Sequence, residues 1–181
     1  MVLQDINFLT LNIITMHITK KLALSFSLCL FALFSISAQG TLPDLTIESL
    51  GGKKINIKEL GTNGKISVFS FWATWCKPCK KELNNIAEIY EEWQDNYNVQ
   101  VIAVSIDDAR TSTKVKTYVD GQSWDYTVLL DKNQDLKKSL NFQTVPFTLL
   151  VDQKGNIVDR HQGYVEGDEY SLEDKIKELA K

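Results

Sequence analysis

Apolar residues along the chain follow the two spacings that distinguish strands from helices. Short runs rich in β-branched and aromatic residues, bounded by glycine or polar turns, predict strands. We place these strands at residues 45–48, 54–57, 66–72, 99–106, 127–130, 147–151 and 157–162. Apolar positions that recur every three or four residues predict helices with one buried face. These lie along Leu83, Ile86, Tyr90, Trp93 and Tyr97, near 113–119, near 134–140, and along Leu172, Ile176 and Leu179.

The order of these elements predicts a single α/β domain. The first two strands flank a turn at Leu50–Gly52 and are expected to form a hairpin. Strands and helices then alternate, and the strands at 66–72 and 99–106 are almost continuously apolar, as parallel strands covered on both faces are. A second hairpin and a helix close the chain. We therefore expect an α/β fold with a central mixed sheet flanked by helices.

The first 38 residues have a different character. Leu22–Phe34 is a run of apolar or small residues, preceded by Lys20 and Lys21 and followed by small residues up to Ala38. A basic region, a short apolar region and a small residue at the cleavage point are the parts of a secretory signal. The run is shorter than the roughly 20 residues of a membrane-spanning helix. We expect cleavage after Ala38, and the alternative is an uncleaved N-terminal anchor.

The start of the chain does not fit a signal segment. Residues 1–15 contain no lysine or arginine, whereas Met16–Lys21 has the basic character that a signal needs. We therefore expect translation to begin at Met16. The predicted organisation is a signal segment at 1–38 and one domain at 39–181, exported to the periplasm or anchored in the membrane facing it.

Composition and charge narrow the range of functions. The chain has 20 Lys and Arg against 23 Asp and Glu, a net charge of -3, with no long run of one sign. This balance argues against nucleic-acid binding as a main function. The chain has three cysteines, and Cys29 lies inside the apolar run of the signal segment. Removal of that segment leaves Cys76 and Cys79 as the cysteines of the domain.

The candidate chemistry is concentrated in the segment Trp75–Cys79, between a predicted buried strand and the start of the longest helix. Two thiols three positions apart at the start of a helix can form a disulfide without straining the backbone. At the helix N-terminus, Cys76 gains from free N–H groups and the positive end of the dipole, which stabilise a thiolate. Cys79, one turn further, suits a resolving thiol. Pro78 fits the first turn because it lacks an N–H group.

Two other interpretations of the cysteine pair are weaker. A structural zinc site needs four ligands, and His161 is the domain's only further candidate apart from carboxylates. A purely structural disulfide would close a loop too short to constrain the unfolded chain much. We therefore expect a redox-active Cys76–Cys79 pair with no metal and no bound cofactor. His161 is expected to be a surface residue of a strand.

The segment Phe71–Glu82, FWATWCKPCKKE, resembles the active site of the thioredoxin superfamily, in particular of the exported TlpA-like (ResA-like) thiol-disulfide oxidoreductases. The resemblance covers nearly all of residues 41–181, including the N-terminal β-hairpin and a strand–helix insert in the middle of the domain. It implies a thioredoxin-like fold in which Cys76 is the attacking nucleophile and Cys79 the resolving thiol.

The resemblance also implies roles for residues around the cysteines. Val145–Pro146 matches the family's cis-proline loop, which faces the disulfide and exposes the Val145 backbone to an extended substrate. A trans proline at the start of a strand is the alternative. Trp75 is expected to be a partly exposed ring that packs on the substrate. Lys77 adds a positive charge that favours the Cys76 thiolate.

One departure from cytoplasmic thioredoxins bears on proton transfer. Ser70 stands where they carry an aspartate that helps to deprotonate the resolving thiol, and serine cannot ionise. Glu82 matches the carboxylate of the TlpA-like branch and follows Cys79 by three residues, which places both on one helix face. We expect Glu82 to accept the proton of Cys79 and to have a pKa raised by partial burial. A solvated helix carboxylate is the alternative.

The implied reaction is thiol-disulfide exchange through a mixed disulfide. Exported compartments are oxidising, so a reductant there needs electrons, which the resemblance assigns to a membrane-bound thiol donor. Apocytochrome c and other exported thiol proteins are the implied substrates, with no nucleic-acid partner and a monomeric protein. The alternatives are a disulfide oxidase or isomerase that uses the same cysteines, and a thioredoxin-fold binding or chaperone module with a non-catalytic disulfide.

Overall fold

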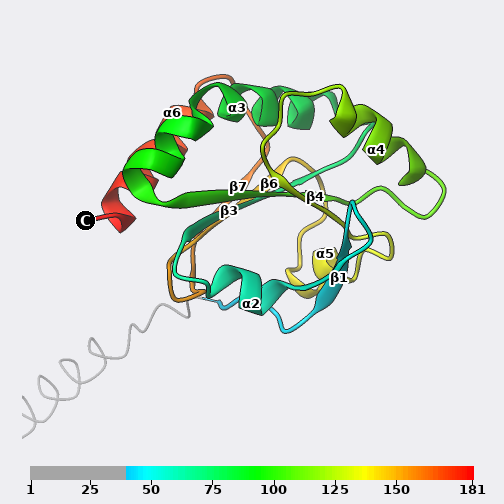
Figure 1. Cartoon of the computed structure of the whole chain (residues 1–181), viewed down its shortest axis with the longest axis horizontal. Helices are drawn as coiled ribbons and strands as arrows, with labels where there is room; N and C mark the ends of the chain where they lie inside the picture. The colour runs from blue at the N-terminus through cyan, green and yellow to red at the C-terminus, as the bar shows by residue number, and fades with distance from the viewer. Residues whose placement is uncertain (1–39) are drawn as a thin grey trace, which may run out of the picture. The chain divides into compact units, whose positions relative to one another are not determined.

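The computed structural model describes residues 40–181, which form one seven-stranded sheet with helices on both faces. The strands are β1 (Thr46–Ser49), β2 (Lys54–Asn56), β3 (Ile66–Trp72), β4 (Val99–Ser105), β5 (Thr127–Leu130), β6 (Phe147–Val151) and β7 (Ile157–Gln162). The helices are α2 (Ile57–Gly61), α3 (Lys77–Tyr97), α4 (Thr113–Asp120), α5 (Asp135–Ser139) and α6 (Asp168–Leu179). In Figure 1, α3, α4 and α6 cover one face of the sheet, and α2 and α5 lie on the other.

The sheet is mixed, as the strand pattern predicts. The strand order is β2-β1-β5-β4-β3-β6-β7. Strands β3, β4 and β5 run parallel to one another, whereas β1, β6 and β7 each pair antiparallel with a neighbour. Every residue of β3 is buried, because helices cover both faces of the sheet around it. The connection through α4 to β5 is the strand–helix insert expected from the family resemblance.

The N-terminal hairpin is present, but its second strand is shorter than the pattern predicts. Strands β1 and β2 pair antiparallel with Ile47 opposite Ile55. The prediction extended the second strand to residue 57 and expected no helix after it, which is wrong. The Asn56 side chain accepts a hydrogen bond from the backbone N–H of Glu59 at 3.1 Å and begins α2 at Ile57. Asparagine is among the residues preferred at this capping position.

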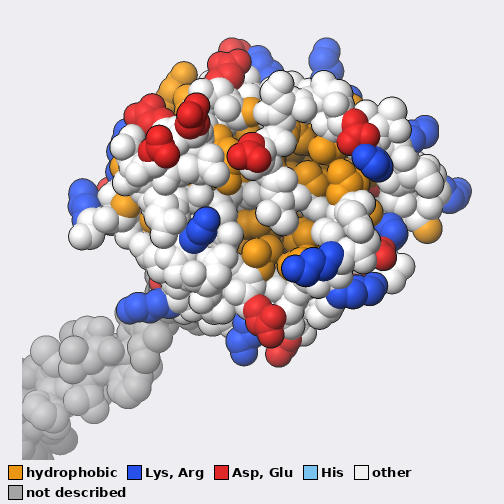
Figure 2. Space-filling view, viewed as in Figure 1, with side chains coloured by type: hydrophobic (Ala, Val, Ile, Leu, Met, Phe, Trp, Pro, Cys, Tyr) orange, Lys and Arg blue, Asp and Glu red, His pale blue; other side chains and the backbone are white. Residues whose placement is uncertain are grey.

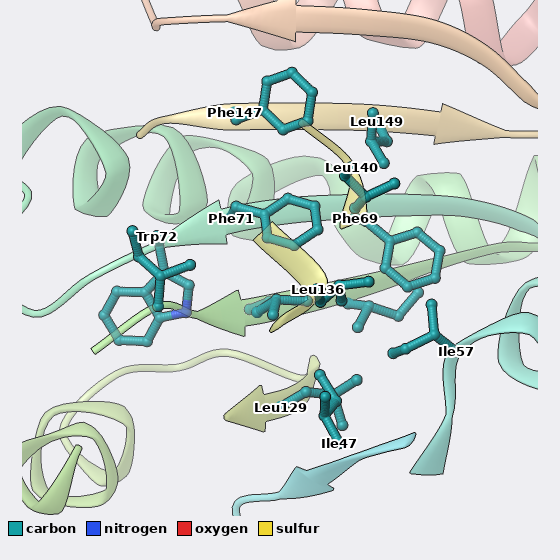
Figure 3. Close-up of a cluster of buried hydrophobic side chains, with 14 of the residues drawn as sticks. Ile47, Ile57, Phe69, Phe71, Trp72, Leu129, Leu136, Leu140, Phe147 and Leu149 are labelled. Carbon is teal, nitrogen blue, oxygen red and sulfur yellow. The ribbon is translucent and has the colours of Figure 1, made fainter. Parts of the chain in front are cut away.

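The core consists of two clusters of buried side chains. One includes Phe69 and Phe71 of β3, with Leu149 and Phe147 of the neighbouring strand β6 (Figure 3). The other lies where α3 and α6 pack on the sheet and includes residues of the apolar stripe of α3. The buried members of this stripe are Leu83, Ile86, Tyr90 and Trp93, as its spacing predicts.

The surface of the domain carries both apolar and charged side chains. In Figure 2, hydrophobic side chains gather in the middle of the view, with acidic and basic side chains around them. No helix within residues 40–181 has the length and apolar character needed to cross a membrane. The predicted start at Met16, the signal segment and its cleavage after Ala38 lie outside the described residues.

The central strand generates a prediction about stability. Ile102 of β4 is fully buried and lies opposite Phe69 of β3 and Thr127 of β5. Ile102→Ala leaves a cavity and is expected to lower the free energy of unfolding by about 2–5 kcal/mol, and Ile102→Val by about 0.5–1.5 kcal/mol. Urea denaturation measures both. The control Val165→Ala removes an exposed side chain and should change stability by less than about 0.5 kcal/mol.

Candidate active site

The two cysteines lie where β3 passes into α3, and the structure joins them by a disulfide. Cys76 is the N-cap residue of α3, and its sulfur accepts a hydrogen bond from the backbone N–H of Cys79 at 3.3 Å. Pro78 lies in the first turn, at a position where a missing N–H group costs no helical hydrogen bond. The sulfur of Cys76 therefore meets the positive end of the helix dipole, which stabilises a thiolate.

The residues of the motif differ sharply in exposure. Trp75 is 65% exposed, Cys76 is 4% exposed and Cys79 is fully buried. Lys77 and Pro78 are exposed as well. An incoming molecule can therefore contact the Trp75 ring, and Cys76 keeps a small exposed surface that Cys79 lacks.

A buried aspartate fixes the turn before the cysteines. Asp107 follows β4 and is 1% exposed. Its carboxylate accepts hydrogen bonds from the backbone N–H of Thr74 at 2.8 Å, from Thr74 Oγ1 at 2.7 Å and from Ser105 Oγ at 2.8 Å. Lys80 donates to the carbonyl of Thr74 at 3.1 Å. Asp107 was not predicted from the sequence, although an acidic residue directly after an apolar parallel strand is a usable signal.

The Val145–Pro146 segment lies at the same edge of the sheet as the cysteine turn. Its peptide bond is cis, as the family resemblance implied. Phe147 pairs with Phe71 near the end of β3, so Pro146 lies level with the start of the turn that leads to Cys76. The carbonyl of Pro146 accepts hydrogen bonds from the N–H of Gly163 at 2.8 Å and from Gln162 Nε2 at 2.7 Å.

Glu82 is a buried carboxylate, so the alternative of a solvated helix residue is wrong. It is 4% exposed, and its two oxygens accept hydrogen bonds from Thr148 Oγ1 at 2.6 Å and from Ser70 Oγ at 3.2 Å. Burial raises the pKa of Glu82 to about 7, although these two hydrogen bonds act in the opposite direction. Its carboxylate makes no hydrogen bond with either cysteine of residues 40–181. Thr148 was not foreseen, because the sequence does not show which residue of β6 faces Glu82.

The arrangement fits redox chemistry of the cysteine pair. A sulfur at a helix N-terminus, a buried partner and a buried carboxylate with a pKa near neutrality are the groups that thiol exchange and its proton transfers require. Within residues 40–181, no group of three or more His, Cys, Asp or Glu side chains is arranged to hold a metal ion.

Known proteins resemble this chain in sequence and in fold. Residues 38–160 match the model of the AhpC/TSA family. Thiol-disulfide oxidoreductase ResA of Bacillus thuringiensis (strain Al Hakam) is 32% identical over 137 residues, which cover 76% of this chain and 75% of that protein.

Two solved structures have a similar fold. A thioredoxin-like protein from Porphyromonas gingivalis is 44% identical, with a TM-score of 0.69 over 77% of this chain and 91% of that one. A candidate protein disulfide isomerase from Bacteroides thetaiotaomicron is 27% identical, with a TM-score of 0.67 over 81% and 91%. The chain therefore belongs to the AhpC/TSA family, within the thioredoxin superfamily, and is a thiol-disulfide oxidoreductase similar to ResA.

Proposed function

We propose that this protein reduces disulfide bonds of exported proteins by dithiol–disulfide exchange. The observation that carries the proposal is the position of Cys76 as the N-cap of α3, with Cys79 buried one turn inside. This placement favours the thiolate of Cys76 over that of Cys79, so the first is the attacking sulfur and the second the resolving one. The likeness to ResA, whose name describes the same exchange, supports the proposal.

The reaction proceeds in two displacements. The Cys76 thiolate attacks one sulfur of the substrate disulfide, a mixed disulfide forms, and the other substrate sulfur leaves as a thiolate. The Cys79 thiolate then attacks the sulfur of Cys76, the mixed disulfide breaks, and the second substrate sulfur leaves. Two electrons have passed from the dithiol to the substrate, and the Cys76–Cys79 disulfide has formed. The protein uses no cofactor other than this pair.

Glu82 accepts the proton of Cys79 in this scheme. Both side chains are buried and lie three residues apart on α3, on one face of the helix. A base is most effective when its pKa lies near the working pH, and burial raises the pKa of Glu82 to about 7. Ser70 and Thr148 hold the carboxylate in place, so Ser70 positions a base instead of acting as one.

The exposed groups around Cys76 bind the substrate. The Trp75 ring packs on the polypeptide that carries the disulfide, and Lys77 adds a positive charge beside the Cys76 thiolate. The backbone of Val145, next to Pro146 at the same sheet edge, pairs with an extended stretch of substrate.

The signal-like sequence at 1–38 supports export to the periplasm, either as a free protein or held by an N-terminal anchor. Because that compartment is oxidising, a membrane-bound thiol protein regenerates the dithiol. Apocytochrome c and other exported proteins with reducible cysteines are the proposed substrates, and the protein acts as a monomer.

A second function is the same exchange run as disulfide isomerisation or oxidation. The likeness to a candidate protein disulfide isomerase from Bacteroides thetaiotaomicron favours this alternative. A thioredoxin-fold binding module, in which the disulfide is only structural, is the remaining alternative. The reduction potential and the trapping of substrate distinguish the three.

Cys79→Ala tests the two-cysteine mechanism. Without the resolving thiol, the mixed disulfide through Cys76 persists, because no internal thiolate attacks it. We expect stable mixed disulfides with reducible proteins, detected by non-reducing electrophoresis and mass spectrometry. The matched control Cys76→Ser, which keeps Cys79, should trap almost nothing because Cys79 is buried. Equal trapping by both variants, or none by either, contradicts the assigned roles.

The reduction potential of the Cys76–Cys79 pair tests the direction of the reaction. The helix N-terminus stabilises the thiolate of Cys76, whereas the buried carboxylate of Glu82, three residues further along α3, disfavours a thiolate at Cys79, and this second effect favours the disulfide form. We expect a potential nearer to the about -270 mV of thioredoxin than to the about -120 mV of the oxidant DsbA. Equilibration with dithiothreitol buffers measures it. A value near that of DsbA means that the protein is an oxidase.

Glu82→Gln tests the raised pKa through stability. The folded protein holds the Glu82 proton up to a pKa of about 7, whereas the unfolded chain loses it near the ordinary value of 4.5. Folding therefore takes up a proton between these values, and stability falls as pH rises through that window. The variant lacks this loss, so the difference between it and the wild type should change by about 3 kcal/mol between pH 4 and pH 8. Urea denaturation of the oxidised proteins measures it, and a pH-independent difference would mean an ordinary pKa.

A further inference from the structure

A small internal cavity touches Glu82 on the side of the sheet covered by α6. Its volume is about 40 Å³, and its lining includes Glu82 of α3, Thr148 of β6, and His161 of β7, together with residues of α6. A cavity needs only about 10–15 Å³ to hold a water molecule when polar partners surround it. This cavity therefore has room for water in contact with the carboxylate of Glu82.

His161 forms a wall of this cavity and also reaches the surface. It lies directly opposite Thr148 in the antiparallel β6–β7 pair, so the two side chains share one face of the sheet. Thr148 is the residue that donates to Glu82. The side chain of His161 is 44% exposed, so the ring contacts both the cavity and the solvent.

Asp168 holds the His161 ring in this position. Its Oδ2 atom lies 3.2 Å from His161 Nε2 and accepts the backbone N–H of Val165 at 2.7 Å. Both side chains of this contact are partly exposed, and the contact keeps the ring against the wall of the cavity.

The other ionisable groups of the cavity are paired with one another. Lys175 of α6 donates to Asp159 of β7 at 2.7 Å. Tyr164 donates to Glu169 at 2.8 Å, and desolvation together with this bond raises the pKa of Tyr164. Hydrogen bonds from the backbone, Tyr164 and Asn85 outweigh the desolvation of Glu169 and lower its pKa.

The ring of His161 differs chemically from the other side chains of this lining. Its imidazole has one ring nitrogen that can accept a proton and one that can donate it, so the ring can pass a proton on. Outside this lining, burial raises the pKa of the Tyr126 phenol, so this group does not remove a proton near neutral pH. His161 is thus the side chain of the lining that is suited to exchange a proton with both the cavity and the solvent.

In the proposed function, Glu82 must pass a proton to solvent. Glu82 takes one proton from Cys79 in each turnover and must release it before the next. It is 4% exposed, and bound substrate covers the Cys76 end of the site during exchange. Apart from residues of α3, the lining of the cavity comes from β6, β7, α6 and the loop between β7 and α6, none of which carries a cysteine.

We propose that the cavity and the His161–Asp168 pair form a proton exit that connects Glu82 with solvent while substrate is bound. The proposal rests on the proposed function, because it assigns the fate of the proton that Cys79 gives to Glu82. Protonated Glu82 passes the proton through cavity water to the neutral imidazole of His161, and Glu82 becomes a carboxylate again. The imidazolium, stabilised by Asp168, then releases the proton to solvent, and no electrons move. His161 is a positioning residue for this transfer, since it acts through Glu82.

The test separates the two displacements in time. Reduced protein is mixed with insulin, and acid quenching at successive times gives the rate at which the mixed disulfide forms and the rate at which it is resolved. We expect His161→Gln to leave formation unchanged and to slow resolution near neutral pH by about tenfold. Added imidazole, at constant pH and ionic strength, should restore the rate of the variant and leave the wild type unaffected. A structural role of His161 would not produce this rescue.

Two further variants keep the test decisive. Ser171→Leu fills the cavity and retains His161, so resolution should slow without rescue by imidazole, even if His161→Gln fails to fold. Lys177→Gln breaks a surface ion pair of the same helix outside the cavity and should change neither rate.

The possible failures are distinguishable. Unchanged resolution in both His161→Gln and Ser171→Leu overturns the proton exit, as does a slow His161→Gln that imidazole does not rescue. A wild-type protein that forms no mixed disulfide with insulin refutes the proposed reduction itself.

Discussion

The register of β3 between its two neighbours is the constraint on which the site depends. On one side, Trp72 pairs with Ser105 of β4, which brings Asp107 to the turn that carries the cysteines. On the other side, Ser70 pairs with Thr148 of β6, and the two hydroxyls converge on Glu82. A shift of one residue would turn every side chain of β3 to the opposite face and separate both groups. The burial of the whole strand on both faces holds this register.

The buried carboxylate of Glu82 lowers the stability of the fold, and the same burial gives Glu82 its reactivity. An ionised carboxyl group inside the domain is unfavourable, and two hydroxyl donors offset only part of that cost, because the pKa of Glu82 remains near 7. The same imbalance makes Glu82 able to take a proton at neutral pH. The hydroxyl of Ser70 can orient the carboxylate but cannot replace it. In the proposed mechanism the acid on α3 therefore takes the role that an acid on the strand has in cytoplasmic thioredoxins.

Local signals in the sequence predicted the elements and the cysteine chemistry. The apolar spacing of α3 and the proline in its first turn indicated both its buried face and its start, and the CxxC spacing indicated the disulfide. The short helix α2 was missed because a single capping residue, Asn56, ends the strand that precedes it. The hydrogen-bond partners of Glu82 could not be predicted from the sequence. Thr148 lies 66 residues away along the chain, and only the register of the strands brings it to the Glu82 carboxylate. His161 is the partly exposed strand residue that the sequence predicted. Its contact with the cavity could not be predicted, because α6 as well as its own strand builds that cavity.

The division of the site between distant parts of the chain has an evolutionary consequence. The sulfur chemistry is encoded in one short segment at the start of α3, whereas the surroundings of the Glu82 cavity come largely from β6, β7 and α6. Substitutions in the C-terminal third can therefore alter the acidity at which a descendant of this protein works best and leave the WCKPC segment untouched. Relatives with identical cysteine motifs can in this way diverge to suit compartments of different pH.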